Sequence, residues 1–185
     1  MVLAMKRVSI LKDTRSMSMR IALLLGWVLW LAVSSFAGDI CPEKVQSVLL
    51  VKVLSYTREI SGAPKGEVSL GVLNGGPMLD FLKGAVASST DKINVKSVGL
   101  DNLAGINVLY IPKGTSSDQV TQAKTKCKSQ KIMSVGGDPN YVVAYNLTLT
   151  FQLVEGKPRM LVCIESADEE GAKFAAEFLK IAEKK

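Results

Sequence analysis

An apolar run near the amino terminus constrains this 185-residue chain most, because it decides in which compartment the rest will fold. Residues 21–33 are all apolar or glycine, and five cations against one acid precede them. Small residues follow, with Ser35 and Ala37 spaced as a signal-peptidase site. A basic segment, a 13-residue apolar core and a small-x-small exit are typical of a secretory signal peptide, which predicts cleavage after Ala37.

The alternative is an uncleaved membrane anchor. A membrane span needs about 20 apolar residues, and a core of 13 favours the signal peptide. In both interpretations the cations stay in the cytoplasm and the folded part is exported. The sequence therefore predicts a signal peptide, residues 1–37, and one exported domain, residues 38–185, which meets the membrane only through that peptide.

The composition of the exported part excludes several classes of protein. Removing the signal peptide takes away five of 23 cations and one of 17 acids, so the net charge falls from +6 to +2. That balance is not typical of a nucleic-acid-binding protein. The chain has no histidine, which excludes Ser-His-Asp and Cys-His catalysis and every His-ligated metal site. We expect no cofactor.

Three cysteines remain after cleavage: Cys41, Cys127 and Cys163. No C-x-x-C motif occurs, which argues against a thioredoxin-like redox role. Cys127, on the inner face of an expected helix, and Cys163, in an expected buried strand, are explained most simply as core residues. If that helix packs over that strand, a Cys127–Cys163 disulfide would stabilise the domain by about 2 to 4 kcal/mol.

The first half of the exported part alternates between helical and strand patterns. Residues 43–60 carry apolar side chains at intervals of three and four, which predicts a helix with one buried face. That face consists of Val45, Val48, Leu49, Val53, Tyr56 and Ile60. Residues 48–51 are also compatible with a strand. Residues 67–73 predict a first strand, residues 92–98 a half-exposed strand near a sheet edge, and residues 106–111, apolar on both faces, the central strand.

Two further helices are marked by their starts. A turn at 61–64 precedes the first strand, and Pro77 fits the first position of a helix over 77–87. Ser116 and Gln119 form a capping box for a helix to about residue 128. The inner faces of these helices are expected to hold Met78, Leu79, Leu82, Ala85 and Val86, and Val120, Ala123 and Cys127.

The carboxyl-terminal part predicts a hairpin and a closing helix. Residues 147–154 alternate strictly between apolar and polar, and Glu155-Gly156-Lys157-Pro158 turns the chain into a strand over 159–164. Ser166 and Glu169 form a second capping box, which predicts a last helix to Lys184.

Helices thus alternate with single strands, including one over 131–135, before the hairpin. Residues 141–145 are ambiguous between helix and strand. The order predicts a single-domain, three-layer α/β sandwich around a mixed, mostly parallel sheet of about six strands, with the hairpin and the closing helix at its end.

Two glycine turns follow predicted strands and are candidate ligand loops: Asn74, Gly75, Gly76, and Gly136, Gly137, Asp138. In a parallel sheet both lie at the carboxyl end, where open α/β folds bind ligands. Neither a Walker pattern nor G-x-G-x-x-G is present, which favours tight turns without a ligand. The lysines at 124, 126, 128 and 131 are likewise more typical of a solvated helix face than of an anion site.

Residues 43–184 resemble the YfiR-like family of small exported bacterial proteins. The resemblance is most specific at the end, where the hairpin leads into Ile164-Glu165-Ser166-Ala167, then Gly171 and the closing segment 177–182. Residues 105–111 and 131–135 stand where the family has two apolar strands, and Val45–Tyr56 where it has its first helix.

The chain also departs from the family pattern. Glu165 stands where the family often has Asn, and Ala144-Tyr145 near the place of a Gly-Gly pair. Leu70, Gly71 and Asn107 stand near the positions of two family cysteines, so the usual disulfide arrangement of the family cannot be transferred.

The resemblance implies a periplasmic regulator. The best-understood member binds the periplasmic part of an inner-membrane diguanylate cyclase and represses cyclic-di-GMP synthesis. Our first hypothesis is therefore a non-catalytic regulatory module that binds an inner-membrane signalling protein, with a homodimer as an option. The second is an envelope carrier or receptor for a small ligand, using the two glycine turns. The third, an enzyme, would depend on the carboxylates Asp80, Asp138 and Glu165, whose spacing indicates no particular reaction.

Overall fold

The structure is a computed structural model that describes residues 39–60 and 67–185. The predicted signal peptide, residues 1–37, and the predicted turn at 61–64 lie outside the described residues. A mixed eight-stranded sheet forms the centre of the described part, in the order β10-β8-β7-β6-β5-β3-β4, and β1 pairs with β7. The six longer strands are β3 (Glu67–Leu73), β4 (Lys92–Val98), β5 (Val108–Ile111), β6 (Met133–Gly136), β7 (Leu149–Val154) and β8 (Lys157–Val162). The two short strands are β1 (Asp39–Ile40) and β10 (Glu183–Lys184).

The sheet is mostly parallel, as the alternation of helices and strands predicts. Strands β4, β3, β5, β6 and β7 pair in parallel, and the β7–β8 hairpin is antiparallel. Glu155 and Gly156 connect the hairpin with φ values of 52° and 72°. Two successive positive φ values are typical of a type I′ turn, whose twist matches that of the strands.

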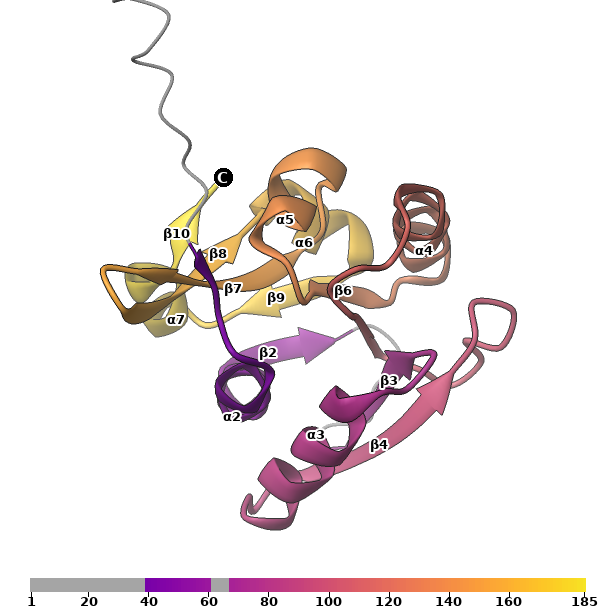
Figure 1. Ribbon diagram of the computed structural model, residues 1–185, viewed down its shortest axis with the longest axis horizontal. Coiled ribbons are helices and arrows are strands. Elements are labelled where there is room, and N and C mark those ends of the chain that lie inside the picture. The colour runs from indigo at the N-terminus through magenta and orange to yellow at the C-terminus, as the bar shows by residue number, and fades with distance from the viewer. Residues whose placement is uncertain (1–38, 61–66) are drawn as a thin grey trace, which may run out of the picture. The chain divides into compact units, whose positions relative to one another are not determined.

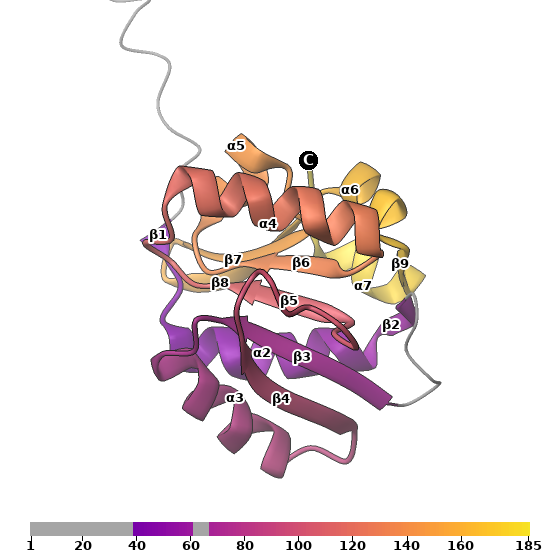
Figure 2. The ribbon, with the colours of Figure 1, turned by 90° about the vertical axis from the view of Figure 1, so that its right-hand side faces the viewer.

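Helices cover both faces of this sheet, which confirms the three-layer sandwich (Figures 1 and 2). One core cluster joins one face to α2 (Glu43–Ser55), α3 (Pro77–Ala87) and α7 (Ala176–Ile181). A second joins the other face to α4 (Ser117–Gln130) and α5 (Pro139–Tyr145), and α6 (Ile164–Glu170) contacts α4. Strand β5 serves both clusters because its side chains alternate: Val108 and Tyr110 belong to the first, Leu109 and Ile111 to the second.

Several predictions are confirmed at the level of single elements. Strand β5 is fully buried between β3 and β6, and β4 is the half-exposed strand at one edge. Ser116 caps α4 by accepting a hydrogen bond from the Gln119 backbone N–H, and Val120, Ala123 and Cys127 are buried. The ambiguous residues 141–145 are helical, in α5.

The face that helix α2 buries differs from the prediction. Val45 and Val48 are exposed, whereas Gln46 and Ser47 are buried. The helix ends at Ser55, and residues 57–60 form strand β2 (Thr57–Ile60). The apolar spacing failed here because Gln46 finds hydrogen-bond partners inside the fold, so its burial costs little.

The predicted single closing helix over 166–184 is also wrong. Helix α6 begins at Ile164, and Ser166 lies inside it and caps nothing; its hydroxyl donates to the Asn146 carbonyl. Gly171 ends α6 with a φ of 74°, a conformation that favours glycine at a helix end. Strand β9 (Ala172–Phe174) then pairs with β2 before α7 begins, so a long-range pairing interrupts the helical pattern.

Candidate functional site

The first predicted ligand loop, Asn74-Gly75-Gly76, connects β3 to α3. The Asn74 backbone N–H donates to the Val98 carbonyl, and that of Gly75 donates to the Val72 carbonyl. All three residues have positive φ, and Gly76 precedes Pro77 at the start of α3. Two of the N–H groups that an anion would need are therefore already bonded, one to β4 and one to the end of β3, so the geometry agrees with a tight structural turn.

The second loop, Gly136-Gly137-Asp138, is held as tightly. The Gly137 N–H donates to the Ile111 carbonyl, and Asp138 caps α5 by accepting from the Asn140 N–H. A Cβ on Gly137 would lie 2.6 Å from the Tyr110 hydroxyl oxygen, so glycine is required by close packing. Both loops lie at the carboxyl end of the parallel sheet, as predicted, but β5 separates their strands.

The sequence analysis missed the role of Gln46. This residue of α2 forms a hydrogen bond with the second loop. Its side-chain nitrogen donates to the Cys41 and Gly137 carbonyls at 2.6 and 3.2 Å. Its oxygen accepts from the Tyr110 hydroxyl at 2.9 Å. Burial raises the pKa of that hydroxyl above its usual value. The fully buried Gln46 thus ties α2, β5 and the β6–α5 turn together.

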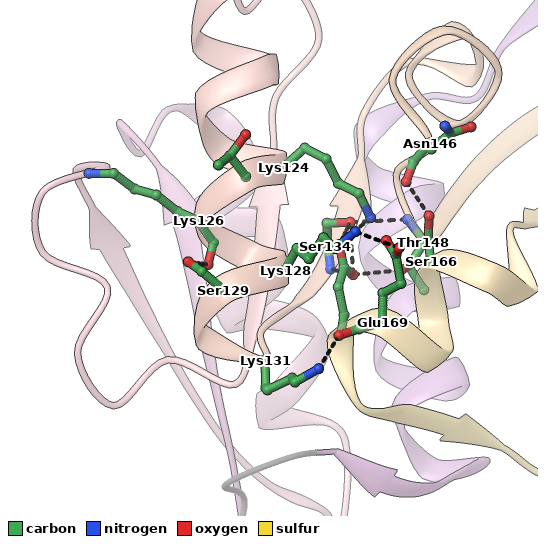
Figure 3. A network of polar contacts seen from close by, with 12 residues as sticks. Lys124, Lys126, Lys128, Ser129, Lys131, Ser134, Asn146, Thr148, Ser166 and Glu169 are labelled. Atoms are coloured by element: carbon green, nitrogen blue, oxygen red, sulfur yellow. Dashed lines mark hydrogen bonds and ion pairs between the residues drawn. The ribbon is translucent and has the colours of Figure 1, made fainter.

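The other feature that the sequence analysis missed is a buried carboxylate, Glu170 at the end of α6. Its side chain is 0 % exposed and pairs with the Lys124 ammonium of α4 at 2.8 Å. It also accepts from the Ser134 backbone N–H at 2.7 Å, from the Ser134 hydroxyl at 2.8 Å and from the Thr148 hydroxyl. Figure 3 shows how Lys124, Ser134 and Thr148 converge on this centre from separate elements.

This arrangement joins elements and leaves no reactive group free. The Ser134 hydroxyl donates to the carboxylate, and its oxygen accepts from the Thr148 N–H at 3.0 Å. Ser134, Thr148 and Glu170 are all 0 % exposed, so a substrate cannot reach them. Among the described residues, no buried side-chain nitrogen or oxygen lacks a hydrogen-bond partner. The Glu170 network is therefore a structural connection between α4, β6 and α6.

An open pocket of about 760 Å³ lies beside this network, between α4 and α6, and Lys124 of the network contributes to its lining. Its lysines already have partners: Lys128 pairs with Glu169 at 2.6 Å, and Lys131 donates to the Glu169 carbonyl at 2.7 Å. The hydrogen bond between the side chains of Lys128 and Glu169 raises the pKa of the ammonium and lowers the pKa of the carboxyl. These contacts match a solvated, internally paired helix face, which was the favoured interpretation of the basic cluster.

The remaining predicted residues do not converge. Asp80 lies in the first turn of α3, Asp138 caps α5, and Glu165 lies in the first turn of α6. Cys41, Cys127 and Cys163 are free and buried, so the structure contains no Cys127–Cys163 disulfide. Cys127 and Cys163 do share the second core cluster, which agrees with their interpretation as core residues. Burial, and secondarily the charge of Glu170, raises the pKa of the Cys127 thiol.

The family follows from a comparison with known family models. Residues 43–183, from the first residue of α2 into β10, match the model described as YfiR/HmsC-like. The chain belongs to this family. Membership supports a periplasmic, regulatory and non-catalytic role in general terms. Among residues 39–60 and 67–185, no helix is both long enough and apolar enough to cross a membrane.

Solved structures share the fold of this YfiR/HmsC-like domain. A conserved domain protein from Vibrio cholerae superposes with a TM-score of 0.58 at 14 % identity, over 80 % of this chain and 61 % of that one. An ABC domain in complex with L-Trp from Streptococcus pneumoniae gives 0.54 at 12 % identity, over 77 % and 60 %. The chain thus spans about three fifths of each, and at these identities the likeness concerns the fold alone. No curated protein sequence matches the chain.

Proposed function

We propose that this chain is a non-catalytic periplasmic regulator that binds an inner-membrane signalling protein and represses it, as YfiR-like proteins do with a diguanylate cyclase. The family match over residues 43–183 carries this proposal. The geometry supports it because the buried hydroxyls and carboxylate of the Glu170 network are used in structural contacts.

Repression by binding requires different affinities for two states of the partner. A domain that binds the inactive state about 1.4 kcal/mol more tightly shifts the equilibrium of the partner tenfold. A signal that alters the exported domain would act by changing this difference.

The test is affinity capture of the exported protein from crosslinked envelopes. It is combined with measurement of cyclic-di-GMP in a strain from which the gene for this protein has been deleted. We expect an inner-membrane cyclase in the captured fraction and a raised cyclic-di-GMP level in the deletion strain. A version without residues 1–37 stays in the cytoplasm and is the control. Recovery of a transporter subunit without any signalling protein, together with an unchanged cyclic-di-GMP level, would overturn the proposal.

That outcome would favour the second candidate, an envelope protein that binds a small ligand. The open pocket between α4 and α6 is the observation in its favour, since its volume of about 760 Å³ lies in the range of small-ligand sites.

A further inference from the structure

A groove lies between α2 and α3. The two helices contact each other and lie at an angle on one face of the sheet (Figure 2). The groove encloses about 670 Å³. Small residues contribute to its lining, namely Ser47 from α2 and Gly84 and Ala85 from α3. A floor of small side chains leaves room for side chains of another molecule.

Two large apolar side chains stand beside this floor in contact with solvent. Val48 of α2 is 57 % exposed and Phe81 of α3 is 39 % exposed, and both line the groove. Single exposed apolar residues are common on protein surfaces. An apolar strip with a polar rim is different, because such a strip is typical of an interaction site.

The rim carries opposite charges on its two sides. Lys44 and Lys52 line the groove from α2, and Asp80 and Asp91 line it from α3 and the segment that follows. None of the ion pairs formed within the described residues involves any of these four side chains. One wall is therefore basic and the other acidic, and their charges are available to a partner.

We propose that the α2–α3 groove binds an amphipathic helix of a partner protein. The complementary helix has an apolar stripe flanked by carboxylates on the side toward α2 and by cations on the side toward α3. The lining from α2 extends from Lys44 to Ser55, eleven steps of 1.5 Å or about 16 Å, so the groove accommodates roughly three turns. This inference rests on the proposed function, because it takes the partner to be the protein that the domain represses.

The surroundings of the groove favour a helix over other occupants. Helices form both walls, so an extended peptide would find no strand edge there with which to pair its backbone. A helix satisfies its own backbone hydrogen bonds. The four rim charges cancel, and a surface of mixed sign has no electrostatic attraction for anionic lipid.

The test replaces Val48 of the exported protein with a photo-crosslinking residue. A second variant, the control, carries the same crosslinking residue at Val143. Val143 is 54 % exposed and lies on α5, whose buried side chains belong to the core cluster on the other face of the sheet, so it controls for exposure. We expect Val48 to crosslink to a helical, amphipathic segment of the inner-membrane partner, identified by mass spectrometry of the crosslinked peptide, and Val143 to give no such product.

Two variants test the groove without the crosslinker. Val48→Asp should weaken partner capture about tenfold or more, because a carboxylate would be buried against an apolar stripe, whereas Val143→Asp should not. Gly84→Leu fills the floor, and a Cβ there meets no atom within 4 Å. Since glycine is a poor helix residue, this variant should keep or raise the melting temperature while capture falls.

Each of the other outcomes contradicts the proposal that the α2–α3 groove binds a partner helix. Crosslinking through Val143 alone, or unchanged capture by Val48→Asp and Gly84→Leu, leaves the proposed function intact and excludes this surface. Crosslinks from Val48 to lipid or to a second copy of the chain would show that the groove binds that molecule and not a helix of a partner protein. If neither position crosslinks and the wild type captures no signalling protein, the proposed function and the groove fail together.

Discussion

Replacing Glu170 with glutamine tests whether the buried carboxylate holds helix α4, strand β6 and helix α6 together. Four donors point at the carboxylate: the Lys124 ammonium, the backbone N–H and hydroxyl of Ser134, and the Thr148 hydroxyl. An amide offers one accepting oxygen and places an NH₂ group among these donors. Glu170→Gln therefore removes the charge and also leaves at least one buried donor without an acceptor.

The size of the effect follows from the burial of both partners. Removing one member of a buried ion pair typically costs about 3 to 5 kcal/mol. Lys124 is 14 % exposed and can recover part of its hydration, whereas Glu170 is 0 % exposed. We therefore expect Glu170→Gln to lower the free energy of unfolding by about 3 kcal/mol, the low end of this range. For a domain near 150 residues this lowers the melting temperature by about 6 to 12 °C.

The assay is urea unfolding of the domain without residues 1–37, followed by circular dichroism, because both tryptophans lie within those residues. The midpoint should fall with an unchanged m-value. Glu169→Gln is the matched control, since Glu169 is the preceding residue but pairs with the half-exposed Lys128 at the surface. A Glu170→Gln midpoint equal to that of wild type, or of Glu169→Gln, would refute the reasoning.

Three further predictions concern a close packing contact, a turn residue with positive φ and two buried titratable groups. Gly137→Ala should lower the melting temperature by several degrees, because its Cβ would lie 2.6 Å from the Tyr110 oxygen; an unchanged melt would contradict this packing. Glu155→Asn should raise the free energy of unfolding by a few tenths of a kcal/mol to ~1 kcal/mol, because asparagine tolerates the positive φ better. A urea-unfolding midpoint equal to or below that of the wild type would contradict this. Burial raises the pKa of the Cys127 thiol above its ordinary value of 9.0 and the pKa of the Tyr110 hydroxyl above its ordinary value of 10.0. At high pH the folded state therefore keeps protons that the unfolded state releases. Stability should therefore fall as pH rises above about 9, and Tyr110→Phe should flatten the decline above about 10 in melts recorded across this range.

The state of the cysteines has its own test, alkylation of the exported protein in denaturant without reductant. Three modified thiols in the mass spectrum would agree with the free cysteines of the structure. Loss of two modifications, together with a crosslinked Cys127–Cys163 peptide in the digest, would indicate the disulfide that the sequence leaves open.

Local patterns were sufficient for most of the sheet. Strand β5 was recognisable because a strand between two helical layers is apolar on both faces. The hairpin was recognisable because the alternation over 147–154 is interrupted by Glu155-Gly156, and a two-residue turn with positive φ suits that position. Ser116 marked the start of α4 because its hydroxyl satisfies a free N–H of the first turn.

The candidate site was only partly predictable. Sequence order placed the two glycine loops at the same end of the sheet, since parallel strands require it. The hydrogen bonds that occupy their N–H groups involve residues such as Val98 and Ile111, which are distant in sequence. Spacing alone could not reveal them.

The sequence alone predicted an export signal and showed the lack of histidine, the order of helices and strands, and the resemblance to the family, because each depends on residue types and neighbouring spacing. The tertiary structure decided which polar side chains are buried. Gln46 and Glu170 lie inside because their partners come from other layers of the fold. The exposure of Val48 and the interruption of the last helical pattern by β9 follow from the same kind of long-range packing, which a local pattern does not encode.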